Sequence, residues 1–83
     1  MDIEHNAKNL LFLIAQLSAD HPKSSAQLHG KPDDVLAGLR QLHLLHLITG
    51  TITHGSIKDP LGYQWASAEN ILLTKRGEAF KPV

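Results

Sequence analysis

The chain changes character near His46, just past the middle of its 83 residues. Before this point, apolar residues recur at the i, i+3, i+4 and i+7 spacing that places them on one face of a helix. After it, β-branched residues concentrate in residues 47–53 and the helical spacing stops. Because a chain of this length has room for only one core, we expect a single α+β domain over residues 1–83.

The first expected helix runs from Glu4 to Ala19. The segment Asp20-His21-Pro22 ends it, because proline cannot continue the helical hydrogen bonds and restricts the residue before it. The apolar stripe of this helix consists of Leu10, Leu13, Ile14 and Leu17.

Two further helices are expected before the change at His46. Ser24 and Ser25 offer hydroxyl caps to a short helix through residues 26–28, which His29-Gly30 closes. A longer helix runs from Pro32 to Leu45, because proline favours the first position of a helix. Its core-facing side carries Val35, Leu39, Leu42 and His46. Its opposite side carries Asp33, Ala37, Arg40, Gln41 and Leu44.

The second half is expected to begin with a β-hairpin. The segment Leu47–Thr53 has the composition of a strand. Residues Gly55–Gly62 are rich in turn formers and are expected to form the loop, with Tyr63–Ala66 as the return strand. Tyr63 and Trp65 alternate and should share one face. They can pack against a partner or stack on a base, but a lone Trp in a small domain more often anchors the core or the base of the hairpin.

The end of the chain is expected to be a short extended piece, Ile71–Leu73, followed by a helix. Thr74 caps this helix, which runs from Lys75 to Phe80 before Pro82. The expected core is apolar throughout: Leu10, Leu13, Ile14, Leu17, Leu28, Val35, Leu39, Leu42, Leu47, Ile48, Ile52, Leu73 and Phe80.

This order of elements resembles the winged-helix variant of the helix-turn-helix. Val35, Leu39 and Leu42, followed by His46-Leu47-Ile48, look like the family's recognition helix leading into a "Gly-Leu-Ile" passage and the first wing strand. His46 stands where the family has glycine in a left-handed backbone, which His tolerates better than a β-branched residue does. The closing residues 73–80 resemble the "Leu-Thr-x-x-Gly-x-x-Phe" ending of small bacterial winged helices.

Within that superfamily, the chain is similar to small YjcQ-like proteins of bacterial and prophage origin. The similarity lies in the helix order, the short length and the "Leu-Thr-Lys-Arg-Gly-Glu" close. Residues 66–70 depart from the pattern, because they make the segment before the last helix longer than the family's.

The resemblance implies that the helix from Pro32 to Leu45 is offered to the major groove of duplex DNA, as in a transcriptional regulator. Arg40 can pair with guanine and Gln41 with adenine, while Lys31 and Lys58 contact phosphates. The aspartates at 33 and 34 have the wrong sign for this approach.

The charge balance also bears on DNA binding. Eight basic and eight acidic residues give a net charge of zero. Cations at 23, 31, 40 and 58 against aspartates at 33, 34 and 59 leave a local balance of +1. Because specific binders often neutralise about 6 to 10 phosphates, we expect DNA binding to require a dimer.

Apolar residues on the outer helix faces indicate an alternative, a winged helix that binds protein without binding DNA. Phe12 falls opposite the apolar stripe of the first helix, and Ala37 and Leu44 lie opposite the core side of the Pro32–Leu45 helix. Large exposed apolar groups can mark a partner surface, although single exposed leucines are common. Phe12 is the candidate contact of a homodimer.

Six histidines raise the question of a metal site, since His43 and His46 are three residues apart on one helix. No Cys is present and no carboxylate flanks the pair, so we expect no metal. Because a free histidine side chain has a pKa near 6.5, any DNA affinity is expected to rise on mild acidification.

Other functional classes lack their sequence signals. Nothing resembles Gly-x-Ser-x-Gly, a Walker loop or His-Glu-x-x-His, so we expect no enzyme, no cofactor and no small-molecule ligand. The longest apolar run, Leu10–Ala15, is far too short to span a bilayer. The lack of Cys fits a cytoplasmic protein.

Overall fold

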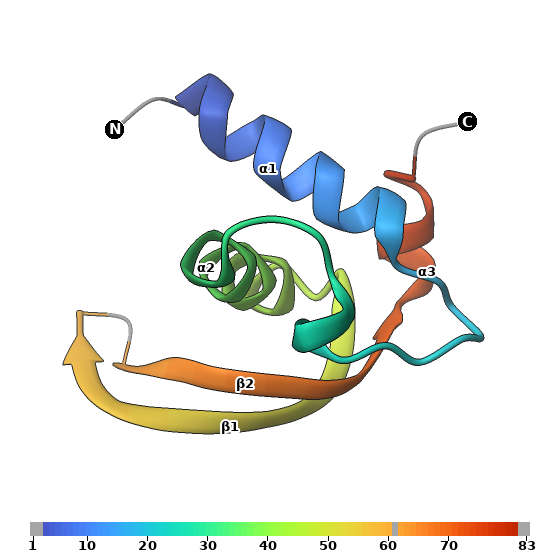
Figure 1. Cartoon of the computed structure of the whole chain (residues 1–83). Coiled ribbons are helices and arrows are strands. Elements are labelled where there is room, and N and C mark those ends of the chain that lie inside the picture. The colour runs from blue at the N-terminus through green and yellow to red at the C-terminus, as the bar shows by residue number, and fades with distance from the viewer. Residues whose placement is uncertain (1–2, 61, 82–83) are drawn as a thin grey trace.

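The computed structural model describes residues 3–60 and 62–81. This part of the chain is mixed α+β, as expected, with three α-helices, a 3₁₀ turn and a two-stranded antiparallel hairpin (Figure 1). The elements are α1 (Ile3–Gln16), η1 (Ser25–Gln27), α2 (Pro32–Leu44), β1 (Ile48–Asp59), β2 (Gly62–Leu73) and α3 (Lys75–Glu78).

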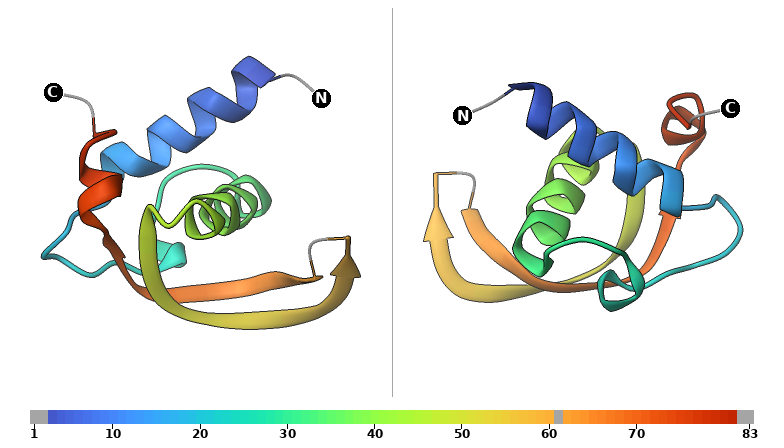
Figure 2. Two further views of the ribbon diagram at one scale, coloured as in Figure 1. Left: turned by 180° about the vertical axis from the view of Figure 1, so that it is seen from behind. Right: turned by 45° about the horizontal axis from the view of Figure 1, so that its top comes forward.

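Helix α2 lies between the other large elements. Helix α1 crosses one side of it, and the hairpin curves along the other side with its concave face toward α2 (Figures 1 and 2). Helix α3 lies beside the C-terminal end of α1, away from the hairpin tip. The hairpin tip therefore lies on the side of α2 that faces away from α1.

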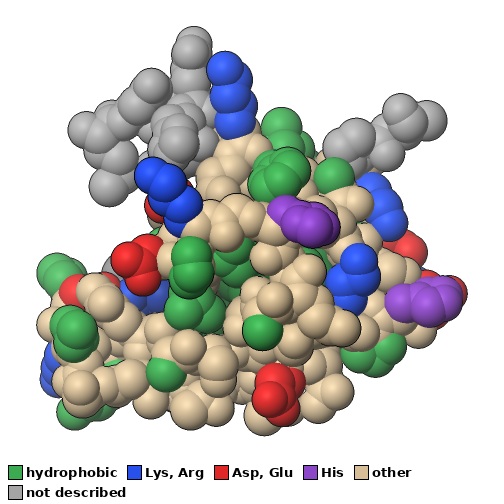
Figure 3. All heavy atoms as spheres, in the orientation of Figure 1, with side chains coloured by type: hydrophobic (Ala, Val, Ile, Leu, Met, Phe, Trp, Pro, Cys, Tyr) green, Lys and Arg blue, Asp and Glu red, His purple; other side chains and the backbone are tan. Residues whose placement is uncertain are grey.

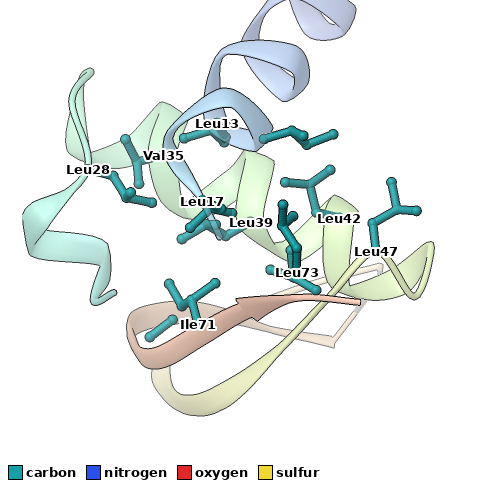
Figure 4. Packing of buried hydrophobic residues seen from close by; sticks show 12 residues of the cluster. Leu13, Leu17, Leu28, Val35, Leu39, Leu42, Leu47, Ile71 and Leu73 are labelled. Carbon is teal, nitrogen blue, oxygen red and sulfur yellow. The ribbon is translucent and has the colours of Figure 1, made fainter. Parts of the chain in front are cut away.

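The core forms where α1, α2 and the base of the hairpin meet (Figure 4). Ten of the expected core residues are buried, while Leu10 and Ile52 are only partly buried. Phe80 was expected in the core but is 53% exposed, because α3 ends at Glu78. Two residues of β2, Ala68 and Ile71, complete the core and were not expected there.

The hairpin is longer than the sequence predicts. The expected loop at 55–62 is wrong, because the strands remain paired to Asp59 and Gly62. The second strand also continues through 67–70, so the extended piece at 71–73 belongs to β2. Three register irregularities interrupt the pairing, and bulges of this kind bend a ribbon and let it accommodate residues that are typical of turns.

Helix α1 ends at Gln16, earlier than the expected Ala19. The backbone carbonyl of Ser18 accepts a hydrogen bond of 2.8 Å from Leu73 N–H and is thus drawn toward β2. The Ser18 hydroxyl donates to Asp20 over 2.5 Å. This bond, with His21 beside it, lowers the pKa of the Asp20 carboxyl. Local polar bonds of this kind compete with helix formation.

The segment between α1 and α2 is tied to both neighbours. Lys23 forms an antiparallel bridge with Ile71 at the base of the hairpin, with hydrogen bonds of 2.8 and 3.2 Å. The side chain of Gln16 bonds both the N–H and the carbonyl of His29. The short helix expected at 26–28 is a 3₁₀ turn at Ser25–Gln27, and Ser24 is its N-cap as expected.

The two passages that carry the family resemblance pack against each other. His46 has a φ of 61°, so the left-handed backbone expected at this position is confirmed. The Thr74 hydroxyl donates to the His46 carbonyl over 2.8 Å, and the Thr74 N–H donates to the Leu47 carbonyl over 3.0 Å. Thr74 also caps α3 by accepting from Gly77 N–H, so the expected cap is confirmed. The His46 side chain, expected toward the core, is exposed.

Replacing His46 by Gly is expected to raise the free energy of unfolding by about 1 kcal/mol, because glycine adopts the left-handed backbone without steric cost. Urea denaturation monitored by circular dichroism measures the change. The control is His46→Val, which is expected to lower the stability because β-branched residues tolerate this region poorly. Equal stability of the two variants would contradict the assigned role of this backbone position.

Candidate functional site on helix α2 and the hairpin

Helix α2 presents the two faces that its sequence predicts. Val35, Gly38, Leu39 and Leu42 are buried against the core. On the other side, Ala37, Gln41 and Leu44 are exposed, as are Asp33 and Asp34 in the first turn. Lys31, the N-cap residue of α2, is exposed as well. The outer face therefore combines apolar, amide and acidic groups.

Arg40 is held by the hairpin. Its two terminal nitrogens donate to the two carboxylate oxygens of Asp59 over 2.6 and 2.7 Å, and a third bond of 3.3 Å reaches the Gly62 carbonyl. The side chains of Arg40 and Asp59 are only 12% and 28% exposed. The hydrogen bonds to Asp59 raise the pKa of the Arg40 guanidinium above its ordinary value.

This pairing bears directly on the predicted site. Arg40 was expected to reach a base edge, but in this structure its donors are directed at Asp59 and Gly62. Sequence reasoning missed the pair because it assigned Asp59 to a loop. The only signal in the sequence was one acidic residue, Asp59, within the segment expected to be a loop. In the structure Asp59 is the last residue of β1.

Two grooves lie between α2 and the hairpin, with volumes of about 420 and 530 Å³. Arg40 and Trp65 border both of them. The first is mainly apolar and is lined further by His43, Leu44, Ile52, His54, Gly62 and Tyr63. The second has an acidic rim and is lined further by Asp33, Asp34, Leu36, Ala37, Ile57, Asp59 and Gln64.

The aromatic residues of β2 take different roles. Trp65 packs against the core, as expected, and the His43 ring meets it edge-on at 5.5 Å between centroids. Tyr63 is exposed and lies opposite Lys58, whose ammonium is 5.7 Å from the centre of the Tyr63 ring. Lys58 is exposed on β1 near the tip. Trp65 therefore helps to hold the hairpin, while Tyr63 and Lys58 face solvent.

The other candidate residues lie apart from the grooves or at their edge. Phe12 on α1 is 49% exposed and lines neither groove. Leu44 is 54% exposed at the apolar groove, and Ala37 is exposed at the acidic one. Whether they contact a partner stays a prediction. On the face drawn in Figure 3, positive and negative side chains are interspersed, and neither sign forms a continuous field.

Comparison with known proteins yields no relative: no family model matches the chain, and no curated protein or solved structure is significantly similar to it. Among residues 3–60 and 62–81, no helix is long and apolar enough to cross a membrane. Within the same residues, no three His, Asp or Glu side chains are grouped so that they could hold a metal ion.

Proposed function

We propose that the chain is a winged-helix protein that binds duplex DNA, with α2 as the recognition helix and the β1–β2 hairpin as the wing. The observation that carries this proposal is the placement of α2 between α1 and a long hairpin, with its outer face exposed at Gln41 and Leu44. The Lys23–Ile71 bridge supports it, because it pairs the segment between α1 and η1 with strand β2 of the hairpin. So does the left-handed turn at His46.

The charges around α2 set the expected strength of binding. Lys31 at the start of α2 and Lys58 near the hairpin tip are exposed cations. Asp33 and Asp34 lie in the first turn of α2 and repel phosphate, and Arg40 is paired with Asp59. One copy therefore offers few phosphate contacts, so we propose that two copies act together, which doubles the number of contacts.

Fluorescence anisotropy of labelled duplex DNA, titrated at several salt concentrations, tests this function. Affinity is expected to fall steeply with salt, because binding releases the counterions of the phosphates. Lys31→Gln is expected to reduce the salt slope by about one. The control, Lys75→Gln on α3 away from the hairpin tip, is expected to leave the slope unchanged. Equal salt slopes for the two variants would show that Lys31 does not contact a phosphate. No binding of duplex DNA at low salt would refute the proposed function.

A second function, binding of a protein partner, is favoured by one observation. The apolar groove is lined by Leu44, Ile52, Tyr63 and Trp65, and the one Arg or Lys within α2 is already engaged by the protein itself. A module without free cations on its central helix is suited to apolar contacts. The DNA titration separates the two functions, since a protein-binding module shows no salt-dependent affinity for duplex DNA.

A further inference from the structure

The distal half of the hairpin is held to the protein by few contacts. The buried residues of the hairpin are Ile48, Ala68, Ile71 and Leu73, all in the half that is nearer its base. Toward the tip, Ile57, Lys58, Tyr63 and Gln64 are exposed. An isolated two-stranded ribbon is marginally stable in water, so the position of the tip depends on its contacts with α2.

The ion pair of Arg40 and Asp59 is the most specific of these contacts. It joins residues 19 positions apart through two charged hydrogen bonds, a geometry that fixes orientation as well as distance. Trp65 provides the apolar part of the contact, since it borders both grooves and packs against the core. Breaking the ion pair would leave the tip held chiefly by Trp65.

A phosphate group can replace the Asp59 carboxylate. Both present two anionic oxygens to the planar guanidinium, which binds either of them in the same bidentate manner. While Asp59 is bound, the pair is electrically neutral, and the groove beside it retains the charges of Asp33 and Asp34. While this pair is formed, the one Arg or Lys within α2 is therefore not available to a DNA phosphate.

We propose that the Arg40–Asp59 pair is a latch that holds the hairpin in an autoinhibited position and that a DNA phosphate opens it by taking Arg40 from Asp59. This inference rests on the proposed DNA binding and adds a regulatory role to the hairpin. In the latched state the protein binds DNA without Arg40, through exposed cations that include Lys31 and Lys58. In the open state Arg40 adds one further phosphate contact.

The test compares duplex DNA affinity, by anisotropy, for the full chain and three variants: Asp59→Asn, Arg40→Gln and the double variant. Asp59→Asn is expected to bind about fivefold more tightly, with a salt slope steeper by about one, because Arg40 becomes available. The gain is expected to vanish in the Arg40→Gln background. Glu69→Gln, which removes a carboxylate from the exposed base of β2, is the charge-matched control and is expected to give little gain.

The outcomes separate the latch from the function on which it rests. If wild type and every variant fail to bind duplex DNA at low salt, the proposed function is wrong, and the latch proposal is then wrong as well. If wild type binds and Asp59→Asn binds equally or more weakly, the latch is wrong and DNA binding stands. A gain that persists in the double variant would also overturn the latch, since it would reflect net charge alone.

A measurement on wild type covers the case in which Asp59→Asn loses its fold. The Arg40 side-chain N–H signal, followed by NMR during addition of duplex DNA, is expected to shift as the guanidinium leaves Asp59. The amides of residues 54–59 and 62–66 are expected to exchange faster with solvent in the bound state. An unchanged Arg40 signal on saturation with DNA would overturn the latch.

Discussion

Replacing Gly77 by Ala is expected to lower the free energy of unfolding by about 3 kcal/mol, which is a large share of the stability of a small domain. A β-carbon at this position would overlap the Leu47 carbonyl oxygen and would lie 3.1 Å from Leu73 Cδ2. The Leu47 carbonyl cannot move away freely, because it accepts the hydrogen bond from Thr74 N–H. Relief of the overlap therefore requires α3 to separate from the turn that follows α2.

Urea denaturation, followed by circular dichroism and Trp65 fluorescence, measures this effect. The matched control is Gly55→Ala in β1, where the added carbon meets only ordinary contacts, the nearest at 3.4 Å from the Gln64 carbonyl oxygen. This control is expected to change the stability by less than about 1 kcal/mol. Equal losses at Gly77 and Gly55 would show that the close approach of α3 to Leu47 is not what requires glycine.

Replacing Leu39 by Ala is expected to cost about 2 to 5 kcal/mol, because the change leaves a cavity in addition to the lost transfer free energy. Leu39 is 0% exposed and lies at the centre of α2, between α1 and the base of the hairpin. Arg40 follows it directly, so loosening of this turn also disturbs the Arg40–Asp59 pair. We expect lower stability and a less protected hairpin tip in hydrogen exchange.

Leu44→Ala is the control for this prediction, because it removes the same atoms from the same helix at a position that is 54% exposed. It is expected to change the free energy of unfolding by less than about 0.5 kcal/mol. The same denaturation experiment applies to both variants. If the two substitutions cost the same, the assignment of the buried and outer faces of α2 is wrong.

The candidate site was only partly predictable. The positions of Gln41 and Leu44 on the outer face of α2 follow from helical periodicity alone, because the side chains of a helix repeat every 3.6 residues. The state of Arg40 does not, since it depends on where Asp59 lies, and that position depends on the length and curvature of the hairpin. Periodicity shows which side chains are outside, but it cannot show which of them meet.

The sequence by itself determined the features that depend on neighbouring residues: the start of α2 at Pro32 and the capping of α3 by Thr74. Backbone sterics and local hydrogen bonds act over a few positions, so a single passage of sequence contains them. Only the tertiary structure decided the features that join distant segments. These are the long hairpin in place of a loop, the closeness of Gly77 to Leu47, and the pairing of Arg40 with Asp59. Each depends on how a curved ribbon and three helices pack around one core, and that packing minimises the free energy of the whole chain and not of any one segment.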